Sequence, residues 1–417
     1  MESLIITSDR LVQHTHKIMD RRFFLQTIVA AAAMTSTAGA NGMTLLENLN
    51  DNHPELNRHK IKAVKYTPVQ LRYPRLVGKN SRLGVHGTGP RITVCTLTTD
   101  QGAEGIGLLR GNTANADKVF ATMKDKSVSE LFLPSQGTVD EQHLAFDFCL
   151  HDLAGIILNK PVYELMGTTK PIVTPCYSGM IYFDEMEPEN NPAGIGKILE
   201  NCHYDYEYGY RQLKVKIGRG GKWMSKEEGL KADIAVTRMI FENFPDCDIL
   251  VDGNDAFTVD YFISYLEGIE DVPLFWIEEP FRETREDYTK LKKWMINHRR
   301  RNTLLADGET NPDLEFCLEL GKEQLLDVYI DDISGYSLTP WRKLAPRLKE
   351  IGMMMSPHAW GNTLKSFYCT HLTGAHGNTP TIEGVTCASD DIDLSAYRLI
   401  RGCMMPPATP GFGMRLK

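Results

Sequence analysis

From residue 213 to residue 383 the chain repeats one pattern, in which a short apolar run ends in a charged or polar residue. Each run is too short for a helix and rich in β-branched or large apolar side chains, which is typical of a buried parallel strand. The runs end, in order, at Lys216, Asp252, Glu278, Glu309, Asp331, His358 and Glu383. Successive ends lie roughly 22 to 36 residues apart, which leaves room for one helix between strands, as in a (β/α) barrel. Because the active site of such a barrel lies at the carboxyl ends of its strands, we expect these side chains to gather in one place.

A smaller α+β domain is predicted before the barrel. Ile61–Arg72 and Ile92–Thr99 have the pattern of long strands, and helical patterns follow near Ala114–Met123 and at Glu141–Leu158. The expected organisation is an export signal and flexible lead-in (1–57), a capping domain (58–170), a barrel (171–390) that begins with the strand Val173–Met180, and a C-terminal segment (391–417) that packs on the capping domain.

Between the first two strands lies a stretch rich in glycine and hydrogen-bond donors. Its donors are Arg75, Lys79, Asn80, Arg82 and His86. Two interpretations are equally open, a solvated loop and a lid over the barrel mouth. As a lid, these donors suit a polyhydroxylated acid better than an aromatic ring.

The first residues have the layout of an export signal. Arg21 and Arg22 precede the mildly apolar segment Thr27–Met34, and small residues up to Ala40 resemble a cleavage site. The Arg-Arg-Phe-Phe-Leu core resembles a twin-arginine signal, which predicts export to the periplasm; the alternative is an ordinary N-terminal helix. Met19 is an alternative start. The apolar segment is shorter than the ~20 residues of a membrane span, so no stable span is expected.

The amino-acid composition argues against some classes of binding partner. The 417 residues carry a formal net charge of −8 and no dense Lys/Arg stripe, which argues against nucleic-acid binding. Nine scattered cysteines show no paired spacing and are read as core residues, not as a disulfide frame or a zinc site. The expected partner is a small carboxylate, and a homo-oligomer remains possible.

Three consecutive predicted strands end in carboxylates, at Asp252, Glu278 and Glu309. Carboxylates that converge on one point repel each other unless a cation lies between them. An all-oxygen set that leaves positions for water and substrate suits Mg²⁺. Asp307 has the same strand parity as Glu309 and remains a further candidate.

Basic side chains are expected on either side of that cation. Lys214 and Lys216 share one strand parity and point inward, and a lysine beside another ammonium and a metal can act as a base near neutral pH. Asp331 and His358 end neighbouring strands, where a carboxylate would fix the imidazole tautomer. Glu383 either bonds a substrate oxygen or pairs with Lys214. Base, cation and imidazole together favour removal of a proton next to a carboxylate.

In combination these motifs resemble the enolase superfamily, mandelate racemase subgroup, over about residues 60–410. The matching motifs are Lys214-Val-Lys216, Val251-Asp-Gly-Asn254, Trp276-Ile-Glu-Glu-Pro280, Gly308-Glu309, Asp331, Ser356-Pro-His358 and Ile382-Glu383. The resemblance implies an α/β fold, a modified TIM barrel (β/α)7β with an N-terminal α+β capping domain. It implies Asp252, Glu278 and Glu309 as Mg²⁺ ligands, Lys216 as one base and the His358–Asp331 dyad as the other base or acid. It also implies Lys214 and Glu383 as holders of the substrate carboxylate. Strand parity and the family pattern select Glu278 and Asp331 over the adjacent Glu279 and Asp332.

We therefore predict an exported, Mg²⁺-dependent enzyme that forms an enediolate and dehydrates an acid sugar (an aldonate or aldarate) to a 2-keto-3-deoxy acid. A racemase or epimerase of a 2-hydroxy acid is the alternative. A non-catalytic exported sugar-acid binding protein on the same scaffold is a more remote one.

Overall fold

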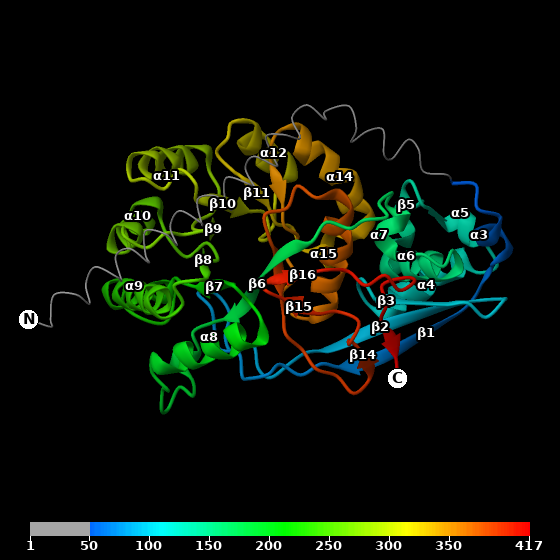
Figure 1. Cartoon of the computed structure of the whole chain (residues 1–417), viewed down its shortest axis with the longest axis horizontal. Helices are drawn as coiled ribbons and strands as arrows, with labels where there is room; N and C mark the ends of the chain where they lie inside the picture. The colour runs from blue at the N-terminus through cyan, green and yellow to red at the C-terminus, as the bar shows by residue number, and fades with distance from the viewer. Residues whose placement is uncertain (1–50) are drawn as a thin grey trace, which may run out of the picture. The chain divides into compact units, whose positions relative to one another are not determined.

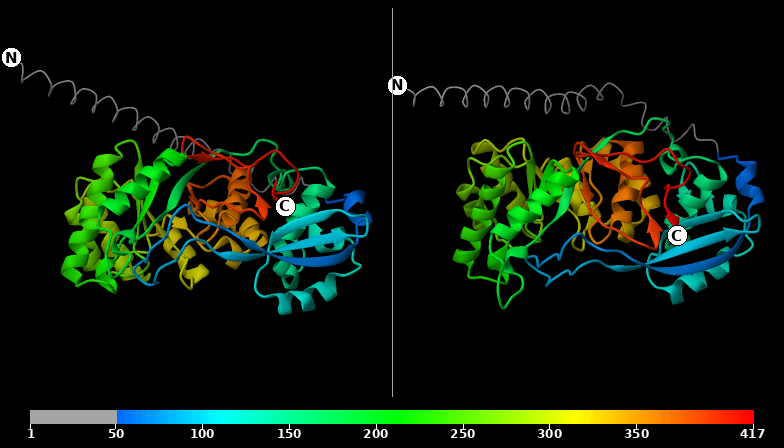
Figure 2. Two further views of the ribbon diagram at one scale, coloured as in Figure 1. Left: turned by 90° about the horizontal axis from the view of Figure 1, so that it is seen from below. Right: turned by 60° about the horizontal axis from the view of Figure 1, so that its bottom comes forward.

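The computed structural model describes residues 51–417. Their first part is built on an antiparallel sheet of β1 (Ile61–Gln70), β2 (Arg91–Thr99) and β3 (Glu104–Leu108), in that order. Helices α4 (Thr113–Met123) and α6 (Asp147–Ile157) accompany it, and α6 packs on β2 and β3. Figure 2 shows this sheet and its helices beside one another. The first two strands and α4 follow the predicted pattern, whereas β3 was not predicted.

Two details of this domain differ from expectation. The predicted helix Glu141–Leu158 is divided into a 3₁₀ helix, η2 (Glu141–Phe146), and α6. A short helix, α3 (Pro54–Arg58), occupies the end of the segment expected to be a flexible lead-in. Leu56 of α3 is buried in the core of this domain, and its loss from water fixes the helix there.

Eight parallel strands form the second part. They are β6 (Thr174–Ile181), β7 (Gln212–Lys216), β8 (Asp248–Asp252), β9 (Trp276–Glu278), β10 (Leu304–Asp307), β11 (Val328–Tyr329), β12 (Met354–Met355) and β13 (Ile382–Gly384). From β6 to β12 each strand pairs with the next, and β13 pairs with β6. The connections carry the helices α8 (Gly196–Tyr208), α9 (Lys226–Asn243), α10 (Val259–Gly268), α11 (Arg285–Asn297), α12 (Leu314–Lys322), α14 (Leu338–Glu350) and α15 (Thr363–His376). This (β/α)7β order confirms the predicted fold class (Figure 1).

The strands of the barrel alternate between two environments. Leu250, Trp276, Ala306 and Val328 belong to one cluster of buried residues inside the barrel, whereas neighbours such as Ile249 and Ile277 belong to the core shared with the helices. Both faces of each strand are therefore apolar, which explains the continuous apolar runs. The interior cluster therefore forms an apolar floor below the strand ends.

The C-terminal residues contact both parts of the described chain. β16 (Cys403–Met404) pairs antiparallel with β6 and with β15 (Leu399–Ile400), and β14 (Ile392–Asp393) pairs with β17 (Arg415–Leu416). Near the end, the backbone N–H of Phe412 donates to the carboxylate of Asp152 in α6 at 2.6 Å. Within residues 51–417, no helix is long and apolar enough to cross a membrane.

Candidate active site

The register of three adjacent strands aligns a lysine and two carboxylates. Lys216 at the end of β7 is the partner of Asp252 on β8, and Asp252 is the partner of Glu278 on β9. All three side chains are buried, and the Lys216 ammonium forms a short ion pair with Asp252. The shared register at the carboxyl ends thus places Lys216, Asp252 and Glu278 side by side in one charged row.

Glu309 joins the row only because the chain turns after β10. On that strand the partner of Glu278 is Ala306, and Gly308 follows with φ 114°. A Cβ on Gly308 would lie 2.5 Å from Cε2 of Tyr329, so only glycine fits this turn. Glu309 leaves the turn with Oε1 3.3 Å from Nε2 of His358, at the far end of the row from Lys216.

Lys214 sits one layer deeper and holds three carboxylates. Its Nζ lies 2.7 Å from Glu278, 3.0 Å from Asp252 and 3.2 Å from Glu383. Burial disfavours the ammonium, but the carboxylates of Glu278 and Glu383 outweigh it and raise the pKa of Lys214. Gly179 on β6 leaves room for Glu383, because a Cβ there would lie 2.3 Å from its Oε1. Lys214 is therefore a fixed cation suited to holding a carboxylate.

The carboxylates of the row have the properties of a cation site. Burial and the neighbouring Asp252 raise the pKa of Glu278 well above its usual value. Oε2 of Glu278 and Oε2 of Glu309 are buried without a hydrogen-bond partner among residues 51–417. Both observations describe negative charge that the protein compensates only in part, and a hard divalent cation would complete the compensation. The three predicted ligands fit Mg²⁺ in chemical type.

Their present arrangement is not that of a formed metal centre. In the part of the chain that the structure describes, no three carboxylate, imidazole or thiol side chains are already grouped to hold a metal ion. The contacts give the reason: Lys214 forms ion pairs with Asp252 and Glu278, while Oε1 of Glu309 lies 3.3 Å from Nε2 of His358. A cation would have to draw Glu309 away from the imidazole and toward the other two.

The imidazole of His358 is held by Asp332, so the prediction that Asp331 pairs with it is wrong. Nδ1 of His358 lies 3.0 Å from Oδ2 of Asp332. Asp331 instead accepts a hydrogen bond from Tyr329 at 3.4 Å, and burial raises its pKa to about 6. Burial also opposes protonation of His358, but Glu309 and Glu383 outweigh it and raise the pKa of His358.

The error has a simple structural cause. Val328 and Ile330 belong to the interior cluster and Tyr329 to the helix-facing core, so the inward parity continues to Asp332 and not to Asp331. Asp332 also begins the short helix α13 (Ile333–Tyr336), accepting the N–H groups of Ser334 and Gly335. The cap and the backbone bridge from Asp332 to His358 fix its carboxylate against the imidazole.

The other two acidic alternatives are hydrogen-bonded to groups outside the row. Asp307 accepts a short hydrogen bond from Tyr288 of α11, on the helix side of the barrel, so the extra candidate of the sequence does not enter the row. Glu279 accepts the backbone N–H of Thr310 at 2.8 Å, and burial and Glu309 raise its pKa to about 8. Glu279 thus fixes the backbone of Thr310, the residue that follows Glu309.

Residues 75–90 form a lid across the barrel mouth, the second of the two interpretations that the sequence allowed. The backbone of Lys79 bridges to Phe183 after β6, and Ser81 donates to the carbonyl of Gly253 after β8 at 2.9 Å. Arg82 donates to Thr310 after β10 at 2.9 Å. In Figure 1 the blue-to-cyan connection leaves the β1–β2 sheet and runs toward β7.

The sequence pattern did not predict two contacts of the site, those of Lys365 and Tyr182. Nζ of Lys365 on α15 lies 2.7 Å from Asp332, so this carboxylate pairs with an ammonium as well as with the imidazole of His358. The ring of Tyr182, directly after β6, lies 5.3 Å from Nζ of Lys216. The helix cap at Asn362 predicts where α15 begins, but not which strand end Lys365 reaches.

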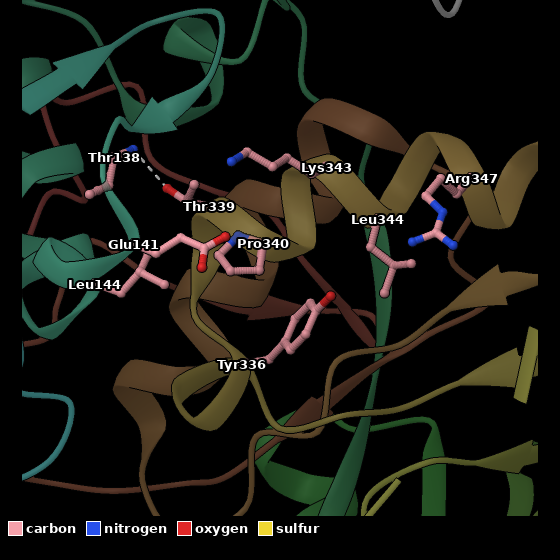
Figure 3. A pocket seen from close by; sticks show the side chains of 9 residues that line it. All are labelled: Thr138, Glu141, Leu144, Tyr336, Thr339, Pro340, Lys343, Leu344 and Arg347. Carbon is pink, nitrogen blue, oxygen red and sulfur yellow. Dashed lines mark hydrogen bonds between the residues drawn. The ribbon is translucent and has the colours of Figure 1, made fainter. Parts of the chain in front are cut away.

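A separate hollow of about 230 Å³ lies between the capping domain and α14 (Figure 3). Glu141 and Thr138 line it from one side, and Thr339, Lys343 and Arg347 from the other. Two of its lining residues are joined by a hydrogen bond from the N–H of Thr138 to Thr339 (Figure 3). This hollow contains no residue of the charged row and belongs to the junction of the two domains.

Comparison with known proteins gives the class. Residues 197–417 match the family model of the enolase C-terminal domain-like proteins. The chain therefore belongs to the enolase superfamily, in the group of mandelate racemases and muconate lactonizing enzymes.

Individual members of this group are similar to the chain over most of its length. The crystal structure of galacturonate dehydratase from Geobacillus sp. is 30% identical, covers 87% of this chain and 95% of its own, and has a TM-score of 0.79. A mandelate racemase/muconate lactonizing protein from Geobacillus sp. Y412MC10, complexed with magnesium and tartrate, is 30% identical over 89% of this chain and 96% of its own, with a TM-score of 0.81. L-rhamnonate dehydratase of Saccharopolyspora erythraea is 24% identical over 88% of this chain and 93% of its own.

Proposed function

We propose that this protein is a Mg²⁺-dependent dehydratase of acid sugars. One observation carries the proposal: the two groups proposed to move a proton, Lys216 and His358, lie at opposite ends of the charged row. Lys216 contacts Asp252, and His358 contacts Glu309. Lys216 ends β7 and His358 follows β12. These two strands are separated by β6 and β13 on one side of the barrel and by four strands on the other. The relatives named as dehydratases of galacturonate and L-rhamnonate support this reaction class.

The residues divide the reaction between them. Lys214 holds the substrate carboxylate, and Lys216 removes the proton from the adjacent carbon. The released electron pair forms a C=C bond as the β-hydroxyl leaves with a proton from His358, and the resulting enol tautomerises to the keto acid. Asp332 keeps the Nδ1–H of His358 in place throughout. Asp252, Glu278 and Glu309 would hold Mg²⁺, which when bound neutralises the charge that develops on the substrate carboxylate.

The test is a screen of purified protein against aldonic, aldaric and uronic acids in D₂O with Mg²⁺. Formation of a deoxy keto acid supports dehydration. Deuterium on the α-carbon with inversion and no keto acid would instead make the protein a racemase or epimerase, because His358 would then return a proton to carbon. A chain that binds an acid sugar without exchange or product would be the non-catalytic binding protein.

We further propose export to the periplasm. The twin-arginine-like segment, with cleavage near Ala40, lies outside the described residues, and the proposal rests on its sequence. Seven of the nine cysteines in the described residues are buried, which suits a protein that folds before transport. Replacing Arg21 and Arg22 by lysine should leave the protein in the cytoplasm, whereas periplasmic recovery of this variant would contradict the proposal.

A further inference from the structure

Two side-chain atoms of the lid, Nε of Arg75 and Nε2 of His86, are buried without a hydrogen-bond partner among residues 51–417. Of the five donor residues singled out in this loop, Arg75 is paired with Asp205 at 2.7 Å, and Lys79 with Glu187 at 3.1 Å. Asn80 accepts N–H groups of its own turn, and Arg82 reaches Thr310. By contrast, Nε2 of His86 is buried without a hydrogen-bond partner among residues 51–417.

The ring of His86 is held in a fixed position beside the base. It packs edge-on against Tyr182 at 4.8 Å and against Trp360 at 5.5 Å between ring centroids. The same Tyr182 ring lies 5.3 Å from Nζ of Lys216. The backbone N–H of His86 donates to the carbonyl of Val77 at 3.0 Å, which fixes the loop at this point. A rigid, pre-positioned polar group at a site is the arrangement that specific recognition requires.

The charge state of the ring restricts what it can do. Burial and the nearby Lys216 ammonium lower the pKa of His86 to about 4. Near neutral pH the imidazole therefore has no proton to give to a leaving group, but it keeps a lone pair and one N–H for hydrogen bonds. His358, which lies between Asp332 and Glu309, remains the acid of the reaction.

We propose that His86 determines substrate specificity, by hydrogen-bonding through Nε2 to a substrate hydroxyl that lies beyond the two reacting carbons. This inference rests on the proposed function, and it names the substrate as a polyhydroxylated acid instead of a simple 2-hydroxy acid. A buried polar group that is left unpaired strongly disfavours the analogue lacking the matching hydroxyl. His86 therefore rejects substrates that are too short or deoxygenated at that carbon.

The test compares wild type with His86→Phe, which retains an aromatic ring against Tyr182 and Trp360, and with His86→Gln, which retains a polar group. The probes are the acid sugar that reacts fastest in the screen and its analogues that lack one hydroxyl beyond the β-carbon. For one analogue, wild type should lose about 100-fold or more in kcat/KM. His86→Phe should lose a similar factor on the parent acid but differ by less than about threefold from wild type on that analogue. His86→Gln should recover part of the loss.

Equal losses of His86→Phe on parent and analogue, or no loss on either, would overturn the inference while leaving the dehydratase proposal intact. If wild type converts none of the acids, the proposed function fails. The role of His86 is then decided by calorimetric binding of galacturonate and its 2-deoxy and 3-deoxy analogues. A preference for galacturonate that disappears in His86→Phe supports the inference, and any other result contradicts it. A thermal unfolding midpoint unchanged from wild type shows that the variants are folded.

Discussion

Oδ2 of Asp332 lies 3.0 Å from Nδ1 of His358, whereas the preceding Asp331 turns toward Tyr329. Two adjacent aspartates of the same chain thus have different roles, and only one of them orients the imidazole. The pair is a natural internal control for the mechanism.

Asp332→Asn should lower kcat by about 10²–10⁴-fold, because the imidazole loses the acceptor that fixes its tautomer and stabilises its charged form. Asp331→Asn, one residue away, should stay within a few-fold of wild type. Steady-state kinetics on the best substrate measures both. The reverse order of effects would restore Asp331 as the partner of His358 and contradict the geometry.

Lys216→Ala should distinguish an enzyme from a binding protein. As the proposed base, Lys216 is expected to be needed for α-proton removal, so turnover and deuterium exchange should fall by several orders of magnitude. Substrate affinity, measured by calorimetry, should change far less because Lys214 still holds the carboxylate. Lys231→Ala is the matched control, since this lysine is exposed and pairs with Glu227 on α9. Retained turnover in Lys216→Ala would rule out Lys216 as the essential base.

Removal of divalent cations should abolish activity, and Mg²⁺ should restore it. Because Oε2 of Glu278 and Oε2 of Glu309 are buried without a hydrogen-bond partner among residues 51–417, added Mg²⁺ should also stabilise the fold. At a concentration about 100 times its dissociation constant, a ligand that binds only the folded state adds about 2.7 kcal/mol. A thermal unfolding assay measures this, and Glu309→Gln should lose most of the response. Glu323→Gln, on an exposed carboxylate, should keep it. A wild type insensitive to Mg²⁺ in both assays would refute the cation site.

The contribution of His371 in α15 to the stability of the protein should fall on mild acidification. Nδ1 accepts the N–H of Tyr163 at 3.3 Å and Nε2 donates to Tyr397 at 2.8 Å, so the buried ring is neutral. Burial lowers its pKa from 6.5 to about 3. The unfolded chain therefore binds the extra proton, and this stabilisation is complete above about pH 6.5 and is lost as the pH falls toward 3. Between pH 7 and pH 5 the loss is about 2 kcal/mol.

Urea unfolding at pH 7, 6 and 5 tests this. His371→Phe should be less stable than wild type at pH 7 because it removes the acceptor of the Tyr163 N–H and the donor to the Tyr397 hydroxyl. The difference between the two proteins should shrink by about 2 kcal/mol on going to pH 5. A constant difference would show that His371 does not titrate on unfolding in this range.

The amino-acid sequence by itself determined the barrel and most of the content of its charged rim. Apolar runs such as Ile249–Val251 and Trp276–Ile277 can only be buried strands, and the residue that closes each run must lie at a carboxyl end. The inward positions of Lys216, Asp252 and Glu278 followed from a strict period of two, which holds as long as a strand stays extended.

Tertiary structure decided everything beyond the last strand residue. Gly308 turns the chain to bring Glu309 into the row, and β11 ends early enough for a helix cap to present Asp332 instead of Asp331. The position of His86 beside Lys216 depends on a loop from another domain, whose contacts with the barrel are distant in sequence. Periodicity describes a regular backbone, whereas turns and contacts between domains are chosen by the packing of the whole molecule, which no local pattern encodes.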